Sequence, residues 1–179
     1  INTWREPVEV NYGKSDDEMG KYAIKSFQTA TKALKEGAID VLVTAPISKY
    51  NIQSEEFKFP GHTDYLSKEF GQEALMLMVC DNLRVGLLTD HIPVTDVAKH
   101  LTEKLITQKV ETLNKSLIQD FSINKPKIAV LGLNPHAGDN GVIGKEDDEV
   151  IKPTVKKLFE KGMMVFGPYS ADGFFGSGQ

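Results

Sequence analysis

Hydrophobic residues recur at helical spacing near the start of the chain, after a polar start signal. The pattern Ser-Asp-Asp-Glu from Ser15 is a capping box, and it predicts an amphipathic helix that ends at Gly37. The apolar positions of this helix are Met19, Tyr22, Ala23, Phe27, Ala30 and Leu34. The β-branched run at 39–43 then predicts a strand that ends at Thr44-Ala45-Pro46. In an α/β sheet, ligands bind at such strand ends.

The middle of the chain alternates helical and extended patterns. Residues 62–70 predict a helix ended by Gly71, and apolar runs follow at 74–80 and 83–89. Only Asp81-Asn82 separates the two runs, and a link this short joins antiparallel strands because a parallel crossover needs about a dozen residues or more. We therefore expect a tight turn there, in a mixed sheet with helices on both faces.

The last third continues the alternation. The expected elements are a helix over 101–121 with Ile106, Val110, Leu113 and Leu117 on one face, a strand over 127–133, a polar loop over 134–144, a helix over 146–161 and a strand over 163–166. This order predicts a layered α/β/α architecture with a mixed, mostly parallel sheet. Asp147-Asp148-Glu149 at the start of the fourth helix is most simply a solvated helix face.

Composition and charge narrow the class of protein. A net charge of −4 with scattered charges does not indicate a nucleic-acid-binding surface. Cys80 is the only cysteine, which excludes an internal disulfide, and its apolar neighbours predict a buried core side chain. No apolar stretch approaches the ~20 residues of a membrane span. These features predict a cytoplasmic enzyme with no membrane or nucleic-acid partner.

Two histidines lie where expected strands end. His136 lies in the glycine-rich run Asn134-Pro135-His136-Ala137-Gly138, and His91 lies in Thr89-Asp90-His91-Ile92-Pro93. Imidazoles from separate loops can converge on a divalent metal without any short sequence spacing. The alternative, a turn histidine hydrogen-bonded to nearby main chain, is equally open from local sequence.

A third segment could bind an anion. Pro60-Gly61-His62-Thr63-Asp64 enters a helix, where unpaired backbone N–H groups and the Thr63 hydroxyl can receive a phosphate. An ordinary helix N-terminus is the alternative. Lys49, after the strand expected at 39–43, offers a similar site or is simply solvated. No Gly-x-Gly-x-x-Gly follows any strand, so no standard Rossmann fingerprint is present.

Taken together, these motifs resemble those of the 4-hydroxythreonine-4-phosphate dehydrogenase family. The matching segments, in order, are 43–49, 60–64, 88–93, 132–139 and 167–172. The resemblance implies the fold of the isocitrate and isopropylmalate dehydrogenases, which bind NAD without a Rossmann fingerprint. It also implies NAD-dependent oxidation of the 3-hydroxyl of 4-phosphooxy-L-threonine, followed by loss of carbon dioxide, on the route to pyridoxal phosphate.

The resemblance also assigns roles to individual residues. His91 and His136 match two of three histidines that bind a divalent metal, which is zinc, magnesium or cobalt. His62 and Thr63 match substrate-binding positions, with His62 also a catalytic candidate, and Asp172 matches a carboxylate for proton transfer. The family forms homodimers whose active sites draw on both subunits, so an apolar patch is expected near 74–89 and 134–144.

Departures from the family pattern predict a central fragment, spanning 1–179, of a longer two-lobed enzyme. The chain begins at Ile1 without a methionine, and the N-terminal glycine- and proline-containing motif is absent. The third metal histidine and the lysine, asparagine and arginine of the substrate site would lie beyond the last residue. Two alternatives remain: a related dehydrogenase for another phosphorylated hydroxy acid, or a non-catalytic role for an incomplete chain.

Overall fold

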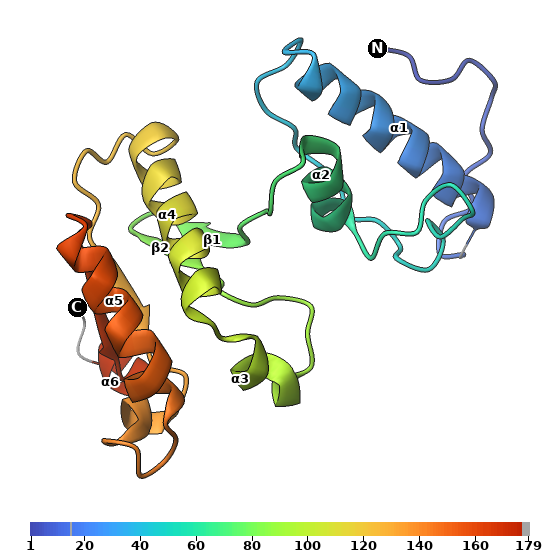
Figure 1. Ribbon diagram of the computed structural model, residues 1–179. Coiled ribbons are helices and arrows are strands. Elements are labelled where there is room, and N and C mark those ends of the chain that lie inside the picture. Colours follow the sequence, from blue (N-terminus) through green and yellow to red (C-terminus); the bar gives the residue numbers. More distant parts are fainter. Residues whose placement is uncertain (15, 177–179) are drawn as a thin grey trace. The chain divides into compact units, whose positions relative to one another are not determined.

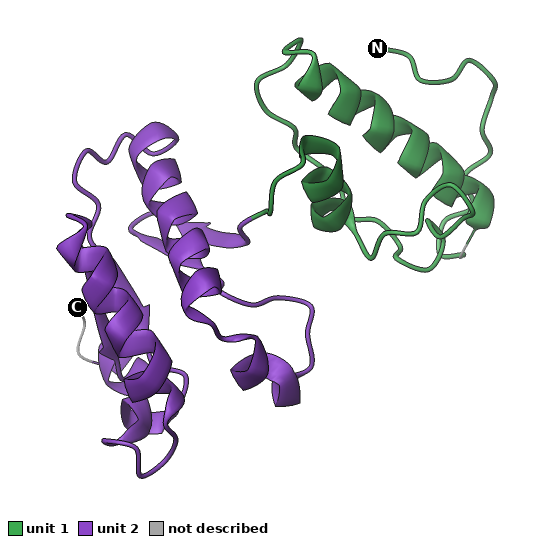
Figure 2. Cartoon of the chain, in the orientation of Figure 1, with its two compact units in different colours: residues 1–74 green, residues 75–179 purple. Residues whose placement is uncertain are grey.

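The computed structural model describes residues 1–14 and 16–176 and divides into two compact units. The first unit is Ile1–Ala74 and the second is Leu75–Gln179 (Figure 2). None of the described helices is long and apolar enough to cross a membrane. The α/β class expected from the sequence is confirmed, because helices accompany both antiparallel and parallel strand pairs.

In the first unit two helices pack through an aromatic core. Helix α1 spans Asp17–Lys35 and helix α2 spans His62–Phe70 (Figure 1). The capping residue of α1 is Asp16, whose carboxylate accepts the N–H of Glu18, whereas Ser15 lies outside the described residues. The core is formed by Ile24, Phe27, Ile52, Phe57 and Tyr65. The buried face of α1 contains Gly20, Ile24, Phe27 and Thr31. Apart from Phe27, these residues lie one position after the expected apolar residues Met19, Ala23 and Ala30.

The strand predicted at 39–43 is wrong. The backbone there is irregular, and the side chains of Val41 and Val43 are 73% and 89% exposed. A β-branched run needs a neighbouring strand to form a ladder, and the described part of the first unit contains no strand to pair with it. Leu42 alone packs against the core of this unit.

The second unit begins with a β-hairpin. Strands β1 (Leu77–Cys80) and β2 (Leu83–Gly86) pair antiparallel with Cys80 opposite Leu83, which confirms the tight turn predicted at Asp81-Asn82. Cys80 is exposed rather than buried, so its predicted place in the core is wrong. The physical reason is that β1 keeps most of its side chains in solvent, including Met78 and Val79.

The rest of the second unit is built around a parallel strand pair. After a 3-10 turn η1 (Val94–Asp96) and helix α3 (Val97–His100) come α4 (Glu103–Gln119), β3 (Ile128–Leu131), η2 (Pro135–Gly138), the π-helical turn η3 (Asp147–Ile151), α5 (Lys152–Glu160), β4 (Val165–Tyr169) and α6 (Ala171–Gly176). Strands β3 and β4 pair in parallel, as a sheet of two separate from the hairpin. Helices α4 and α5 supply Ile106, Val110, Leu117, Val155 and Leu158 to the core beside these strands.

Candidate functional site

The parallel pairing of β3 and β4 brings His136 and Asp172 together. Leu131 lies opposite Tyr169 at the ends of the two strands, and the N–H of Gly132 donates to the carbonyl oxygen of Tyr169. The segments that follow, η2 and α6, therefore leave the same edge of the sheet. The His136 Nδ1 lies 3.2 Å from the Asp172 Oδ2, with both side chains more than half exposed. This contact leaves the Nε2 of His136 available for a ligand.

Asp172 carries a pKa below the ordinary range for an aspartate. The main cause is the hydrogen bond that the Ser170 hydroxyl donates to its Oδ1, and a protonated His136 lowers the pKa further. The side chain is exposed, so the carboxylate is ionised at neutral pH and can exchange protons with water. Ser170 was not selected from the sequence. Its place at the end of a strand, two residues before a candidate carboxylate, is the signal that could have identified it.

Replacing Ser170 by alanine should raise the pKa of Asp172 toward the ordinary value for an aspartate. The carboxylate loses the donor that most favours its charged form, and a lost hydrogen bond to the charged state shifts the pKa upward. A titration of the Asp172 carboxyl carbon by NMR measures the shift. Ser67→Ala is a matched control, because the Ser67 hydroxyl accepts from the N–H of Ala74 and no Asp172 contact involves it. An unchanged Asp172 pKa in Ser170→Ala would contradict this assignment.

His91 and His136 share an unusual backbone conformation. Their φ angles are 52° and 53°, in the left-handed region that non-glycine residues rarely adopt. Such a residue costs roughly 1–2 kcal/mol relative to the right-handed form, although histidine is among the types enriched there. Both side chains are exposed. Strained backbone of this kind clusters at active sites and ligand-binding sites, so it favours the hypothesis that both histidines are functional.

His91 and His136 both lie in the second unit, in different segments of the chain. His91 lies between β2 and η1, and His136 lies in η2. Within residues 1–14 and 16–176, no group of three or more His, Cys, Asp or Glu side chains is arranged to hold a metal ion. The convergence of His91 and His136 on one cavity therefore stays a prediction.

His62 and Thr63 form the first turn of α2 in the other unit. The ring of His62 packs edge-on against Phe27, with centroids 4.7 Å apart, and partial burial lowers the pKa of this histidine. The imidazole is therefore neutral at neutral pH. The N-cap residue of α2 is Gly61. Because glycine has no side chain, the first backbone N–H groups of α2 receive no side-chain cap from this residue. This geometry agrees with the anion-binding prediction but does not test it.

The interpretation of Asp147 as a solvated acid is wrong. Asp147 is fully buried, and its carboxylate accepts hydrogen bonds from the main-chain N–H groups of Leu133 and Asn134 and from the Asn134 side-chain amide. The sequence did carry a signal: Asp147 precedes the buried residues Ile151, Val155 and Leu158 at spacings of four, four and three. This places the carboxylate on the core face of the helix.

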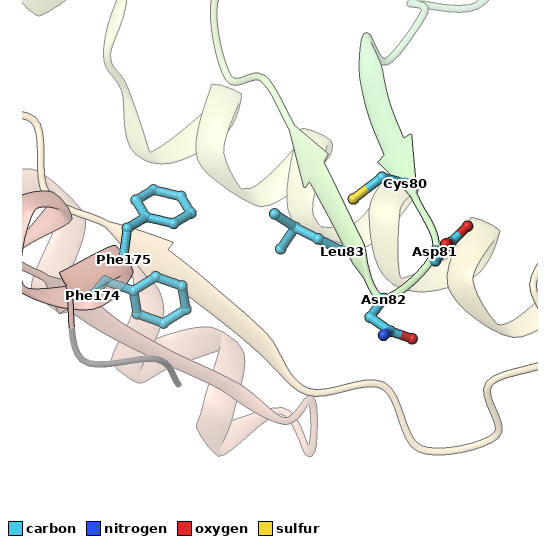
Figure 3. Close-up of a pocket in the computed structure, with 6 residues that line it drawn as sticks. All are labelled: Cys80, Asp81, Asn82, Leu83, Phe174 and Phe175. Carbon is cyan, nitrogen blue, oxygen red and sulfur yellow. The ribbon is translucent and has the colours of Figure 1, made fainter.

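An open cavity of about 400 Å³ lies between the hairpin turn and α6 (Figure 3). It is lined by Cys80, Asp81, Asn82, Leu83, Phe174 and Phe175. None of the predicted site residues lines it, so this cavity does not coincide with the contact between His136 and Asp172.

Comparisons with known proteins point to one family. A family model described as "Pyridoxal phosphate biosynthetic protein PdxA" matches residues 2–179. The chain is 48% identical to 4-hydroxythreonine-4-phosphate dehydrogenase of Bacteroides thetaiotaomicron, over 99% of this chain and 50% of that protein. It is 43% identical to the protein of the same name from Sulfurihydrogenibium sp., over 94% of this chain and 52% of that protein.

Solved structures agree with the sequence matches. The crystal structure of a 4-hydroxythreonine-4-phosphate dehydrogenase from Burkholderia phymatum superposes with a TM-score of 0.78 at 34% identity, covering 95% of this chain and 52% of that one. A terephthalate 1,2-cis-dihydrodiol dehydrogenase from Burkholderia xenovorans superposes with a TM-score of 0.67 at 26% identity, covering 96% of this chain and 56% of that one. The chain thus spans about half the length of the curated relatives it matches.

Proposed function

Because the chain belongs to the PdxA family of pyridoxal phosphate biosynthetic proteins, we propose that the full-length protein is a 4-hydroxythreonine-4-phosphate dehydrogenase. It would oxidise the 3-hydroxyl of 4-phosphooxy-L-threonine with NAD and release carbon dioxide from the resulting β-keto acid. We place this reaction in the cytoplasm, and the presence of one cysteine in these 179 residues agrees with a reducing compartment.

The observation that carries the metal part of this proposal is the contact between His136 and Asp172. Histidines that bind metals usually donate their other ring N–H to a carboxylate, which fixes the tautomer and the ring orientation. Asp172 accepts from the His136 Nδ1 side, so the Nε2 is the atom that would bind a divalent cation. The exposed His91 would supply a second imidazole. Imidazole donors of this kind would suit a divalent metal such as zinc or cobalt, with further ligands supplied from outside these two histidines.

The residues of this chain have separable tasks in the proposed reaction. The cofactors supply hydride acceptance by NAD and Lewis-acid polarisation of the substrate oxygen by the cation. Asp172, with its lowered pKa, is a weak base, and its oxygens already face the Nδ1 of His136 and the Ser170 hydroxyl, so it would take up the proton of the substrate hydroxyl through water rather than by direct contact. Neutral His62 and the hydroxyl of Thr63 would hold the substrate phosphate at the first turn of α2.

A turnover assay on the full-length protein tests this proposal. With 4-phosphooxy-L-threonine, NAD and zinc, cobalt or magnesium, NADH and carbon dioxide should appear in equal amounts. Removal of the metal with a chelator should stop both. The absence of NADH under all three metals would contradict the proposal. The same assay on residues 1–179 alone separates an incomplete chain from an active one.

A related dehydrogenase is the second candidate, because a dihydrodiol dehydrogenase shares the fold at a TM-score of 0.67. That neighbour shows that the fold can accompany a different substrate. Profiling the full-length protein against phosphorylated hydroxy acids distinguishes the candidates. Higher kcat/KM for another phosphorylated hydroxy acid than for 4-phosphooxy-L-threonine would favour the second candidate.

A homodimer with shared active sites is the assembly we expect. Its support is that apolar side chains are exposed both in the hairpin and in the loop after β3: Met78 and Val79 are 57% and 53% exposed, and Val142 is 82% exposed. A contiguous apolar patch beyond ~600 Å² would be unusual for a monomeric protein, and a patch of this extent stays a prediction here. Covering these side chains with a second subunit would remove them from water and stabilise the dimer.

Subunit mixing tests whether the site is shared. Two inactive full-length variants, His62→Ala and His136→Ala, are combined after verified subunit exchange. If these residues serve one site from different chains, mixed dimers should regain about one intact site in two, because one of the two sites then contains both native residues. Each variant mixed with itself is the control. Absence of recovered activity would mean that His62 and His136 act within one chain.

A further inference from the structure

Asp147 is a buried carboxylate that the proposed reaction does not use. It is completely buried, whereas the side chain of its neighbour Asp148 is 38% exposed and bonds to Lys152 at the surface. Aspartates are almost never fully buried unless they are paired or hydrogen-bonded. The location of its hydrogen-bond donors therefore indicates what Asp147 does.

All three donors belong to the two residues that lead from β3 into the loop of His136. The Oδ1 of Asp147 accepts the N–H of Leu133 at 2.9 Å, and its Oδ2 accepts the N–H of Asn134 at 3.1 Å and the side-chain Nδ2 of Asn134 at 2.9 Å. The Asn134 amide also donates to the Oε2 of Glu146 at 2.9 Å. The start of the helix formed by η3 and α5 is thereby tied to the turn that precedes His136.

The chain leaves room for this carboxylate on both sides of His136. A Cβ at Gly132 would lie 2.9 Å from the Asp147 Oδ1. A Cβ at Gly138 would lie 3.5 Å from the Oδ2 and 2.8 Å from the carbonyl oxygen of Gly144. Larger residues at either glycine would therefore displace the carboxylate or the loop.

The loop that follows the residues bonded to Asp147 has a backbone conformation that its surroundings must hold in place. His136 to Gly141 are six consecutive residues with positive φ, and four of them are not glycine. Such a run persists only where the surroundings hold it. The carboxylate of Asp147 anchors Leu133 and Asn134, which come just before this run. Beyond the run the chain returns to Asn134, because Gly144 lies against the Asn134 side chain and Glu146 accepts a hydrogen bond from it.

We propose that Asp147 is a positioning residue for the metal site: through Leu133 and Asn134 it holds the loop that presents His136 to the divalent cation and to Asp172. This inference rests on the proposed function, because the role of His136 as a metal ligand is itself a proposal. Asp147 does not touch the cation. It fixes the direction from which the imidazole approaches, as second-sphere groups do for metal-bound histidines.

The test measures metal affinity on the full-length protein, using Co²⁺ alone as the probe. In Asp147→Asn an NH₂ group replaces one carboxylate oxygen and faces an N–H donor, so at least one of the three hydrogen bonds is lost at almost constant volume. The dissociation constant for Co²⁺, measured by competition with a chelator, should rise about 10- to 100-fold. The Co²⁺ absorption spectrum should also change, because the geometry of the ligands changes. Asp148→Asn is the matched control, with the same charge change one residue away, and should bind Co²⁺ like the wild type.

Four outcomes decide the proposal. Weaker Co²⁺ binding by folded Asp147→Asn and not by Asp148→Asn supports it. Wild-type Co²⁺ affinity in a folded but less stable Asp147→Asn protein would overturn it, because Asp147 would then serve stability alone. If Asp147→Asn does not fold, the variant Asn134→Ala decides instead, because it removes only the side-chain amide. An unchanged dissociation constant for Co²⁺ in this variant would overturn the proposal. A rise smaller than the one expected for Asp147→Asn would support it.

A further variant, His136→Ala, separates the failure of this proposal from the failure of the proposed metal-binding function of His136. If His136→Ala binds Co²⁺ as tightly as the wild type, the metal assignment fails and the role of Asp147 fails with it. If His136→Ala loses Co²⁺ while Asp147→Asn keeps it, only the positioning role is overturned.

Discussion

Replacing His136 by alanine in the full-length protein is expected to lower metal-dependent turnover by on the order of 1,000-fold. Lewis-acid catalysis contributes several kcal/mol to the transition state, and each ~1.36 kcal/mol corresponds to a factor of ten in rate. The same loss is expected for His91→Ala. Because both side chains are exposed, neither replacement opens a cavity in the core, and the variants should keep their fold by circular dichroism.

His100 provides the matched control for these two histidines. It is exposed, its Nδ1 contacts the carbonyl oxygen of Asp96 at 2.8 Å, and it lies at the end of α3 without a proposed ligand role. His100→Ala should retain wild-type turnover. Undiminished activity of His136→Ala, or turnover that persists in metal-free buffer, would contradict the metal assignment.

Gly20→Ala is expected to destabilise the first unit by about 1–3 kcal/mol, the usual cost of overpacking. The sign is opposite to that expected from helix propensity, because an alanine in a helix interior is normally about 1 kcal/mol more favourable than glycine. A Cβ at Gly20 would overlap the backbone carbonyl of Asn51, and backbone cannot move aside as a flexible side chain can. Denaturant unfolding of the full-length protein, followed with a probe in the first unit, measures the change.

Gly173→Ala is the control for this overlap, because Gly173 is also helical and a Cβ there would meet nothing closer than the Ser170 side chain at 3.9 Å. Here alanine should be neutral or stabilising by up to about 1 kcal/mol. Equal effects of the two substitutions would mean that the close approach of α1 to Asn51 is not a feature of the folded protein.

Capping residues and apolar spacing predicted the helices correctly where the packing of the folded chain favours the same structure. Helix α2 begins and ends at the residues that the start signal and Gly71 indicate, and the apolar spacing of α4 identified Ile106, Val110 and Leu117 as core. The hairpin followed from a two-residue link alone. The run at 39–43 failed because a strand depends on a partner elsewhere in the chain, which β propensity does not describe.

The candidate site was predictable only in part, for a similar reason. The sequence identified His136 and Asp172 separately, and their contact requires that β3 and β4 pair in parallel and end at the same edge. Asp147 was misinterpreted because it lies in an acidic run, where charge suggested solvent although the helical period indicated the core. The sequence carried only a weak signal for the left-handed backbone of His91, since histidine is enriched in that conformation but adopts it only where its surroundings impose it.

Anomalous diffraction from zinc-loaded crystals of the full-length protein tests the central claim most directly, namely that His91 and His136 bind one divalent metal. We expect a single strong peak at the zinc edge, about 2.0–2.1 Å from the His136 Nε2 and from a ring nitrogen of His91, with Asp172 on the other nitrogen of His136. A fully occupied zinc site that includes neither histidine would contradict the account.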